Sequence, residues 1–571
     1  MKKAFVLFLA ALMVFSMFAC TAKPAETTPA TEEPAAAADP ATEASAEAQV
    51  ELSDKTFTAA MTATPTSLDE GFSTNTHCRQ VSPHIFETLF TFDEGSAVIP
   101  QLVDTYTVSE DGLVYDVTLR RGITFHDGST FDADDAVASV ERYKMNSTYN
   151  GALDTVSVEK VGDYEIKFTL EEPLALPSLL AFPQRVIMIP KEIAETHMGV
   201  ELDDAALIGT GPYMLKEWVR DVHIVLERFE NYVQDERYEG PTGFGGKRVA
   251  YYKTINLEAV TEAEARIAGL ETGEFDFAEE LPPTSYDRIN DNSDLTATIL
   301  KPGKAIVVEF NHAEGFTADP NFRKALALAI DPTEVLMSVT SGRTEFFRLD
   351  PSLYQPEQYF YTEAGSEGVY NAKNLDKVKE LLAAANYNGE EIVYLYNKDF
   401  ANHYAAGISL IEQWQAAGIN IVPKLQDWTT QLSIAQSLTG WSINQSSYSP
   451  RFDPNQVRSM IHSGTLGGYG FSDAEVDEYL EAIGRGGTNE ERLAIWEKLQ
   501  ARIWETLPFL KFGDSLSLSA IRADIQGYTP SYVDRFWMVH EEETGEISTI
   551  RQDSCGAYAP QESSPIIDLH A

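Results

Sequence analysis

Hydrophobic and polar residues alternate in some parts of the chain and recur at helical spacing in others, which predicts interleaved strands and helices. Residues 115–119 and 164–170 alternate apolar and polar side chains, a period typical of half-buried strands. We expect a helix to begin at Asp319-Pro320, because aspartate caps helices and proline suits their first turn. Residues 408–414 and 490–507 are amphipathic and precede a glycine and a proline, which predicts two more helices. No repeat of about 20–50 residues is present, which argues against a solenoid or a propeller.

The first 20 residues have the layout of a secretory signal peptide. Two lysines precede the continuous apolar segment 4–15, which is shorter than the roughly 20 residues of a membrane-spanning helix. Ala19-Cys20 resembles a bacterial lipobox, although Met17 and Phe18 stand where such sites usually have leucine and a small residue. We expect residues 1–20 to direct export and Cys20 to become the lipidated first residue. The alternative is plain secretion, with Cys20 removed or unmodified.

Residues 21–53 are rich in alanine, proline, glutamate and threonine and contain few bulky apolar side chains. Such a segment cannot bury enough apolar surface to fold, so we expect a disordered linker. Proline and mutually repelling glutamates keep such a linker extended. Its expected role is to hold a folded body away from a membrane.

Composition and charge exclude several classes of function. The 571 residues, 43% of them hydrophobic, are enough for several domains with sizeable cores. The 43 lysines and arginines against 88 aspartates and glutamates give a net charge of −45, which excludes nucleic-acid binding. The three cysteines form no Cys-x-x-Cys pair and the ten histidines are scattered, so we expect neither a metal site nor a cofactor.

Short segments spread over the folded body, in a fixed order, resemble those of the extracellular solute-binding proteins, family 5. These are the peptide- and nickel-binding components of bacterial ABC importers. Each segment alone is a weak signal, but the order and spacing of all the segments together are specific to this family. The segments are HIFETLF at 84–90, VIPQLVDTY at 98–106, SEDGLVY at 109–115, LRRGITFHDG at 119–128, FDADDA at 131–136, GTGPY at 209–213 and RKALALAID at 323–331.

The resemblance implies a two-lobed α/β fold of the periplasmic-binding-protein type, in its large class (type II). Lobe one would comprise residues 54–300 and 522–571, with an extra subdomain at about 98–208, and lobe two would be residues 301–521. The chain would cross between the lobes near Pro302-Gly303 and near Arg522. Ligand would contact both lobes only when they close, which shifts an open–closed equilibrium.

The function implied by the resemblance is that of a binding protein without enzymatic activity. It would act outside the cytoplasm, lipid-anchored to the cell membrane, as a monomer. It would deliver a solute to the permease and ATPase of an ABC importer. The alternative is a sensor that presents its ligand to a membrane receptor.

The nature of the solute depends on a motif in the predicted second lobe. Peptide binders of the family often carry Trp-x-x-Asp-x-x-Asp-Pro, whose first aspartate pairs with the α-ammonium of the peptide. Here Asp453-Pro454 keeps the end of the motif, but Ser447 and Pro450 replace the tryptophan and the first aspartate, and Arg451 adds a positive charge. We therefore expect a ligand without an obligatory α-ammonium: a longer or modified peptide, a saccharide, an anionic solute or a metal chelate. A free-amine peptide is the alternative.

Other side chains are candidates for the same site. Dipeptide binders place an arginine for the ligand carboxylate where this chain has Asn397-Lys398, and lysine replaces arginine only as a non-bidentate charge. Aromatic rings could stack on the ligand or belong to the core, and Arg79 could reach the cleft from lobe one. The predicted ligand-binding residues are Arg79, Asn397, Lys398, Trp428, Trp441, Tyr448, Arg451 and Asp453.

Two further patterns carry less weight. Gly513-Asp514-Ser515-Leu516 spells an esterase nucleophile signature, but it lies near the C-terminus, and the tail Asp568-Leu569-His570 is one residue short of the expected Asp-x-x-His. We therefore do not expect an enzyme. Cys78 and Cys555 fall in the same predicted lobe, where a disulfide and two free thiols are both open alternatives.

Overall fold

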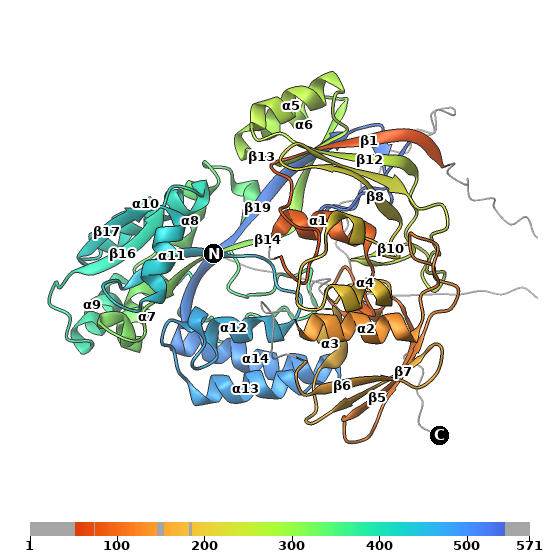
Figure 1. The fold of residues 1–571 in the computed structure, drawn as a ribbon. Helices are drawn as coiled ribbons and strands as arrows, with labels where there is room; N and C mark the ends of the chain where they lie inside the picture. The colour runs from red at the N-terminus through yellow and green to blue at the C-terminus, as the bar shows by residue number, and fades with distance from the viewer. Residues whose placement is uncertain (1–51, 74, 146–152, 182–185, 543–571) are drawn as a thin grey trace, which may run out of the picture. The chain divides into compact units, whose positions relative to one another are not determined.

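The computed structural model describes residues 52–73, 75–145, 153–181 and 186–542 (Figure 1). The expected signal peptide, Cys20, Cys555 and all but the last two residues of the expected linker lie outside the described residues. None of the described helices combines the length and the apolar composition needed to cross a membrane. The chain from Val50 onward forms one unit, and the description below concerns this unit alone.

A mixed sheet of eleven strands is the central element. The order is β17 (Ile421–Gln426), β16 (Ile392–Asn397), β18 (Ile443–Tyr448), β14 (Leu295–Phe310), β19 (Phe509–Arg522), β13 (Phe277–Leu281), β1 (Ser53–Met61), β12 (Tyr252–Ala259), β9 (His223–Arg228) and β8 (Tyr213–Val219), with β15 (Phe347–Arg348) paired to β19. We call β13, β1, β12, β9 and β8, with their helices, the β1 side, and β17, β16 and β18, with theirs, the β18 side. β14 and β19 lie between the two sides and are antiparallel to their neighbours.

The long strands β14 and β19 connect the two sides (Figure 1). Their ladder shifts register after the Leu300–Ser517 pair and resumes at Lys304–Ser515, so residues 301–303 lie opposite Leu516 alone. The part of β14 before the shift pairs with the C-terminal half of β19, and that half of β19 pairs with β13 on its other edge. The part of β14 after the shift pairs with β19 on one edge and with β18 on the other. The shift therefore marks the place where the sheet passes from one side to the other.

The expected crossings can be compared with this ladder. Pro302-Gly303, the first expected crossing, lies within the register shift. Arg522, near which we expected the second crossing, pairs with Leu295 at the end of β19, whereas Leu516 is the residue opposite the shift. The lobe boundaries themselves stay a prediction.

The β18 side has a core on each face of the sheet, because successive residues of β14 point to opposite faces. Ile306, Val308 and Phe310 belong to one core, and Ala305 and Val307 to the other. The first core includes side chains of α7 (Pro320–Leu328), α8 (Pro332–Val339), α9 (Leu375–Ala384) and α10 (Ala401–Ala416), and the second those of α12 (Arg458–Ile461), α13 (Ala474–Gly484) and α14 (Asn489–Thr506). Ala435 of α11 (Trp428–Gln436) packs in a smaller cluster beside β16.

The β1 side also has a core on each face of the sheet. It includes the segment of the chain after β19. Phe536 packs against Phe57 of β1 with ring centroids 5.1 Å apart, so the segment after β19 returns to this side. A Cβ at Gly209 or Gly211 would lie 2.1 Å or 2.5 Å from a carbonyl oxygen at the end of α1, so glycine is required where this loop meets the helix. The helices here are α1 (Thr76–Ile85), α4 (Lys191–Thr196), α5 (Ala263–Thr272) and α6 (Tyr286–Asn290).

A separate four-stranded sheet lies within the expected extra subdomain. Its strands enclose a core with two helices, and Gly112 has φ 72° in the turn between the first two strands, as the Asp111-Gly112 pair indicates. The order is β4 (Val103–Val108), β5 (Val114–Leu119), β7 (Glu165–Leu170) and β6 (Val156–Lys160), with α2 (Ala133–Lys144) and α3 (Leu176–Ala181). Short two-stranded ladders join β2 (Phe90–Phe92) to β3 (Val98–Pro100), β10 (Pro241–Thr242) to β11 (Gly245–Gly246), and β20 (Ile525–Gln526) to β21 (His540–Glu541).

The elements predicted from periodicity are confirmed, with shifted ends. The segments 115–119 and 164–170 are β5 and β7, and the Asp319 side chain caps α7 by accepting from the Asn321 N–H at 2.8 Å. The helix expected at 408–414 begins seven residues earlier, and the one expected at 490–507 is α14. The mixed α/β class is therefore as predicted.

Candidate ligand-binding site

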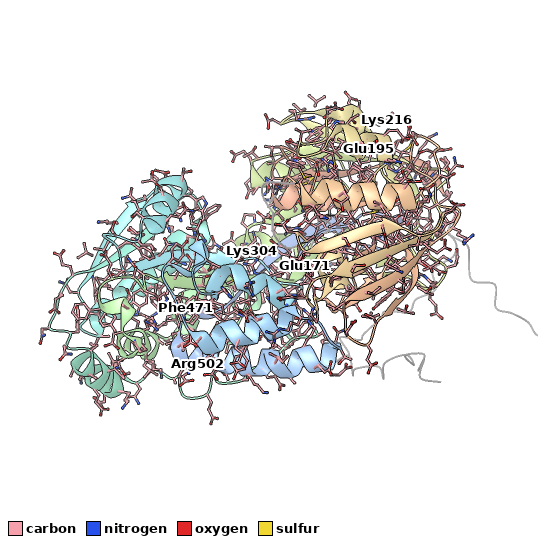
Figure 2. All side chains as sticks on the ribbon, turned by 60° about the horizontal axis from the view of Figure 1, so that its bottom comes forward. Glu171, Glu195, Lys216, Lys304, Phe471 and Arg502 are labelled. Atoms are coloured by element: carbon pink, nitrogen blue, oxygen red, sulfur yellow. The ribbon has the colours of Figure 1, made fainter. Side chains whose placement is uncertain are left out.

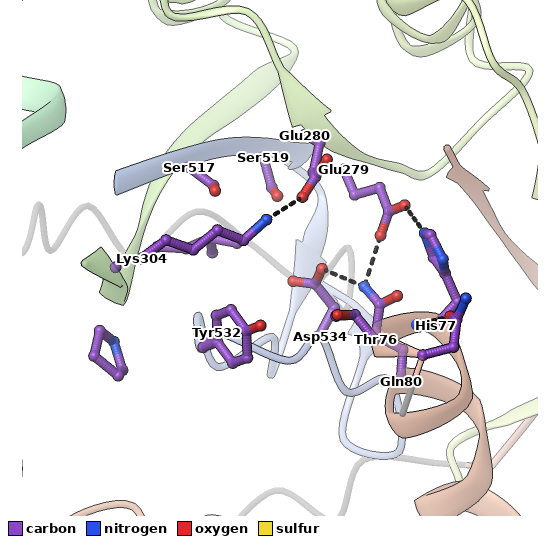
Figure 3. A pocket seen from close by; sticks show the side chains of 14 residues that line it. Thr76, His77, Gln80, Glu279, Glu280, Lys304, Ser517, Ser519, Tyr532 and Asp534 are labelled. Carbon is purple, nitrogen blue, oxygen red and sulfur yellow. Dashed lines mark hydrogen bonds and ion pairs between the residues drawn. The ribbon is translucent and has the colours of Figure 1, made fainter. Parts of the chain in front are cut away.

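A cavity of about 240 Å³ lies at the register shift between β14 and β19. Its walls come from α1, β13, β14, β19 and the segment after β19, which are distant in the sequence (Figure 3). The polar side chains in the wall are those of Asn75, Thr76, His77, Gln80, Glu279, Glu280, Lys304, Ser517, Ser519, Tyr532 and Asp534.

Glu279 is the most heavily hydrogen-bonded of these groups. Its Oε1 contacts His77 Nε2 at 3.2 Å and its Oε2 accepts from Gln80 Nε2 at 2.6 Å (Figure 3). Oε1 also accepts from the Thr62 N–H at 2.7 Å. Burial raises the pKa of this carboxyl, but His77 and these donors outweigh burial, so the pKa lies below its usual value. Glu279 is therefore ionised at neutral pH.

Asp534 is the second buried carboxyl in the wall. Its Oδ1 accepts from the Tyr528 hydroxyl at 2.5 Å and its Oδ2 from Gln80 Nε2 at 3.2 Å. Burial and the nearby charge of Glu279 raise the pKa of Asp534 to about 7. A carboxylate offers about four acceptor positions, so Asp534 retains capacity for a further donor.

The other charged groups leave the cavity acidic. Lys304 Nζ lies 3.2 Å from Oε1 of the exposed Glu280, and Figure 2 shows Lys304 between the elements of the two sides. Burial lowers the pKa of His77, but the carboxylate of Glu279 outweighs it, so the pKa of His77 is raised. Three carboxyl groups thus face one ammonium and one imidazole, an arrangement that favours a cationic group of a ligand.

The β18 side approaches this cavity through two contacts. The Tyr532 hydroxyl donates to Ser449 Oγ at 2.7 Å, which joins the cavity wall to the loop after β18. Burial and the charge of Lys304 lower the pKa of His403 to about 4, so a neutral His403 lies near the cavity lysine. His403 Nε2 in turn contacts Ser447 Oγ at 3.0 Å. The cavity therefore lies where both sides of the sheet can reach a ligand.

The structure places several predicted ligand-binding residues in the core. Asn397 is fully buried and bonds His403 and Gln431, and Trp441 is 2% exposed. The Tyr448 hydroxyl donates to Glu309 Oε1 at 2.9 Å. For these aromatic rings the structure matches the alternative that they belong to the core.

The remaining predicted residues differ in their surroundings. Lys398 is exposed, and Trp428 is half-buried, 5.6 Å from the His403 ring. Both oxygens of Asp453 accept from Arg492, so its carboxylate is engaged within the protein. Arg79 and Arg451 each have a buried Nε without a hydrogen-bond partner.

Cysteine and metal chemistry are absent from the described site. Cys78 is buried, and burial raises the pKa of its thiol. No group of three histidine, cysteine, aspartate or glutamate side chains able to hold a metal ion occurs among the described residues. The pairing of Cys78 with Cys555 stays open.

Sequence reasoning did not single out the acidic residues of the cavity. Glu279 comes two residues after Phe277, so in a strand the two side chains point to the same face of the sheet. A charged residue on the buried face of a strand was a signal that the sequence offered. Asp534 offered no such signal, because its place depends on the return of the chain after β19 to the β1 side.

Comparisons with known proteins give a consistent result. The family model described as bacterial extracellular solute-binding proteins, family 5, middle region, matches residues 97–468. A protein of Sinorhizobium fredii named "Probable peptide ABC transporter periplasmic-binding protein y4tO" is 26% identical over 469 residues, which are 79% of this chain and 87% of that protein. The glutathione-binding protein GsiB of Salmonella paratyphi A is 24% identical, over 81% and 90% of the two chains. The crystal structure of the ABC transporter substrate-binding protein CtaP of Listeria monocytogenes has the same fold, with a TM-score of 0.74, 21% identity and coverage of 85% and 99%.

Proposed function

Because the chain belongs to family 5 of the bacterial extracellular solute-binding proteins, we propose that it captures an amine-bearing solute, in the first place a short peptide. Members of the family are the solute-binding components of ABC importers and act outside the cytoplasm. They are transport proteins, which confirms the expectation that the chain is not an enzyme. Ser515 of the esterase-like segment lies in β19, where it pairs with Lys304 of β14.

The acidic cavity at the register shift is the observation that carries this proposal. A buried ammonium costs several kcal/mol unless a carboxylate pairs with it. The position where the family motif supplies that carboxylate is Pro450 here, but Glu279, Glu280 and Asp534 supply carboxyl groups from elsewhere in the chain. The reason for expecting a ligand without an α-ammonium therefore no longer holds.

The names of relatives agree with an amine-bearing ligand. One relative is named as a peptide-binding protein and another as a glutathione-binding protein. Peptides with a free N-terminus and glutathione both carry an ammonium group. The cavity of about 240 Å³ is smaller than the 300–1,000 Å³ typical of whole-ligand pockets, so it would hold one end of such a solute.

Closure of two lobes would complete the site. The expected lobes are residues 54–300 with 522–571, and residues 301–521. The register shift at 301–303, opposite Leu516, supports a hinge in the paired strands β14 and β19. Ligand held by the acidic wall would then meet the β18 side near Ser449 and His403, as the hydrogen bond from Tyr532 and the charge of Lys304 indicate.

Export and anchoring follow from the N-terminal sequence. We propose that Cys20 is lipidated and that the linker 21–53 holds a monomeric binding protein at the outer face of the cell membrane. The layout of residues 1–20 and the composition of the linker support this.

Calorimetric titration tests the ligand class. The parent protein is titrated at pH 8 with a mixed di- and tripeptide library and with the same library after N-acetylation. Acetylation removes the positive charge and leaves the side chains and the carboxylate unchanged. We expect binding of the free-amine library and an affinity at least tenfold lower for the acetylated one. Equal affinities would overturn the assignment of an ammonium group to the ligand.

A further inference from the structure

We propose that Arg79 and Arg451 form a second subsite, which binds an anionic group of the solute, a carboxylate if the solute is a peptide. Only the identity of the molecule that carries this anion rests on the proposed function. The presence of an anion-binding pair does not.

Arg79 lies on α1, one residue before Gln80 of the cavity wall. Its side chain belongs to a residue only 9% exposed, and its buried Nε has no hydrogen-bond partner. Asp69, a buried carboxylate close in the sequence, is already bound by Arg142 at 2.5 Å. Among the described residues, no carboxylate pairs with Arg79.

Arg451 lies in the loop after β18, on the other side of the sheet. Its guanidinium carbon is 5.8 Å from the centroid of the Tyr448 ring, and its Nη2 lies 3.4 Å from the sulfur of Met460. Its Nε is also buried without a partner. No ion pair of Arg451 occurs in the part of the chain that the structure describes.

Buried arginines elsewhere in the described chain differ from these two. Arg142, Arg248 and Arg492 each bind a buried carboxylate. Arg266 and Arg323 instead donate to several backbone carbonyl oxygens. A guanidinium carries five N–H donors and stays charged, so burying one without an oxygen acceptor is costly. The buried Nε–H groups of the two exceptions therefore call for an acceptor from outside the described protein residues.

Both arginines belong to segments that adjoin the acidic cavity. Tyr532, a wall residue, donates to Ser449, two residues before Arg451, and Arg79 adjoins the wall residue Gln80. Burial lowers the pKa of Arg451, and the positive charge of Arg79 lowers it further. An anion between them would relieve this repulsion.

The subsite has a consequence for closure. Arg79 comes from the β1 side and Arg451 from the β18 side, so one anion would bind both sides at once. A solute with an ammonium in the acidic cavity and a carboxylate at the arginines would be held at both ends. This place differs from Asn397-Lys398, where the family resemblance located the carboxylate partner.

Peptide titration tests the subsite with a defined pair of probes. The di- and tripeptide library is compared with its C-terminally amidated form, in the parent and in Arg451→Gln and Arg79→Gln. We expect the parent to bind the free acids at least tenfold more tightly and either variant to lose most of that preference. Arg451→Lys should keep part of it, because the charge remains without the bidentate fork. Equal binding of acids and amides by the parent would overturn the proposal.

A second measurement does not depend on any peptide. The melting temperature of the parent and of the double variant Arg79→Gln/Arg451→Gln is measured in sulfate and in chloride at equal ionic strength. We expect the ligand-free double variant to melt higher than the parent, because two repelling buried charges are gone. Sulfate should raise the melting temperature of the parent more than that of the double variant, because an anion that binds only the folded state stabilises it.

The control variant is Arg485→Gln, which removes an arginine with a 59% exposed side chain and should respond to sulfate as the parent does. An equal sulfate effect in the parent and the double variant would contradict the subsite, whichever solute the protein carries. If neither peptide library binds, the proposed ligand class fails, and the sulfate comparison still decides the subsite.

Discussion

Asp453 and Arg492 form a buried bidentate ion pair, in which Arg492 Nη2 lies 2.8 Å and 2.7 Å from the two oxygens of Asp453. Asp453 Oδ1 also accepts from the Asn455 N–H at 2.9 Å, which caps the 3₁₀ turn Pro454–Val457. The aspartate that ends the family motif thus ties the loop after β18 to α14. It does not face the acidic cavity.

We predict that Asp453→Asn destabilises the protein by about 3–5 kcal/mol, because it leaves the Arg492 charge buried without a partner. Urea denaturation measures this free energy of unfolding. Asp287→Asn breaks an exposed pair with Arg343 and should change the free energy of unfolding much less, because water screens that pair. An Asp453→Asn protein as stable as this control, but with lower affinity for free-amine peptides, would make Asp453 a ligand residue instead.

Affinity for an amine-bearing ligand should fall as the pH decreases from 8 to 5.5. The pKa of Asp534 is raised to about 7, so its carboxyl is mostly ionised at pH 8 and mostly neutral at pH 5.5. Only the ionised form attracts an ammonium, so each unit below pH 7 should lower the affinity up to about tenfold. His77 gains positive charge as the pH falls, which acts in the same direction, while Glu279, with its lowered pKa, stays ionised and Lys304 stays charged.

Calorimetry at several pH values checks this dependence, and buffers of different ionisation enthalpy report the proton that Asp534 releases on binding. Asp534→Asn should show a weaker dependence on pH and release less than half of that proton. An affinity that is constant from pH 5.5 to pH 8 would contradict the assignment.

Local pattern and order of motifs predicted much of the fold. Capping by Asp319 and the turn at Asp111-Gly112 depend on a few neighbouring residues, so they could be predicted from sequence. Helix ends were less predictable. α10 begins at Ala401, and Ala406, which precedes the predicted segment, packs in the same core as Leu410 within it. Tertiary packing of this kind leaves only a weak local signal.

The site was harder to predict because it is assembled from distant segments. Arg79 and Arg451 were singled out as charged residues near expected loops, but their lack of partners appears only in the fold. Glu279 and Asp534 meet through Gln80, which bonds both. Trp441 and Tyr448 looked like ligand platforms in the sequence, yet their rings are buried at 2% and 9% exposure.

Ligand binding should make the protein more compact, by closure about the register shift of β14 and β19. Small-angle scattering of the parent with the saturating free-amine library should give a smaller radius of gyration than without it. A Cβ at Gly303 would lie 2.4 Å from the Ser515 carbonyl oxygen, so Gly303→Ala should displace β14 at this point and reduce the change. Gly240→Ala, at a glycine without positive φ where an added Cβ meets nothing within 4 Å, is the control. An unchanged radius in the parent with bound ligand would contradict the hinge.

The Cys20→Ala variant should lose its membrane attachment. Two acyl chains anchor a protein stably, whereas a protein without them and without a spanning helix is released. Fractionation of cells that express either form measures the share in the membrane pellet, and Cys78→Ala, at a buried thiol, serves as the control. Recovery of Cys20→Ala in the membrane fraction at the parental level would disprove lipidation at this residue.

The central claim is that the ammonium of the ligand lies beside Asp534 in the acidic cavity, and a double-mutant cycle tests it most directly. Free-amine and N-acetylated libraries are titrated at pH 8 into the parent, Asp534→Asn and the control Asp276→Asn, whose carboxylate pairs with Arg522 outside the cavity wall. A hydrogen bond between charged groups contributes about 1.5–3 kcal/mol, so acetylation should weaken binding about 10- to 150-fold in the parent and in Asp276→Asn. In Asp534→Asn it should weaken binding only a few-fold. The same loss on acetylation in all three proteins, or no loss in the parent, would contradict the claim.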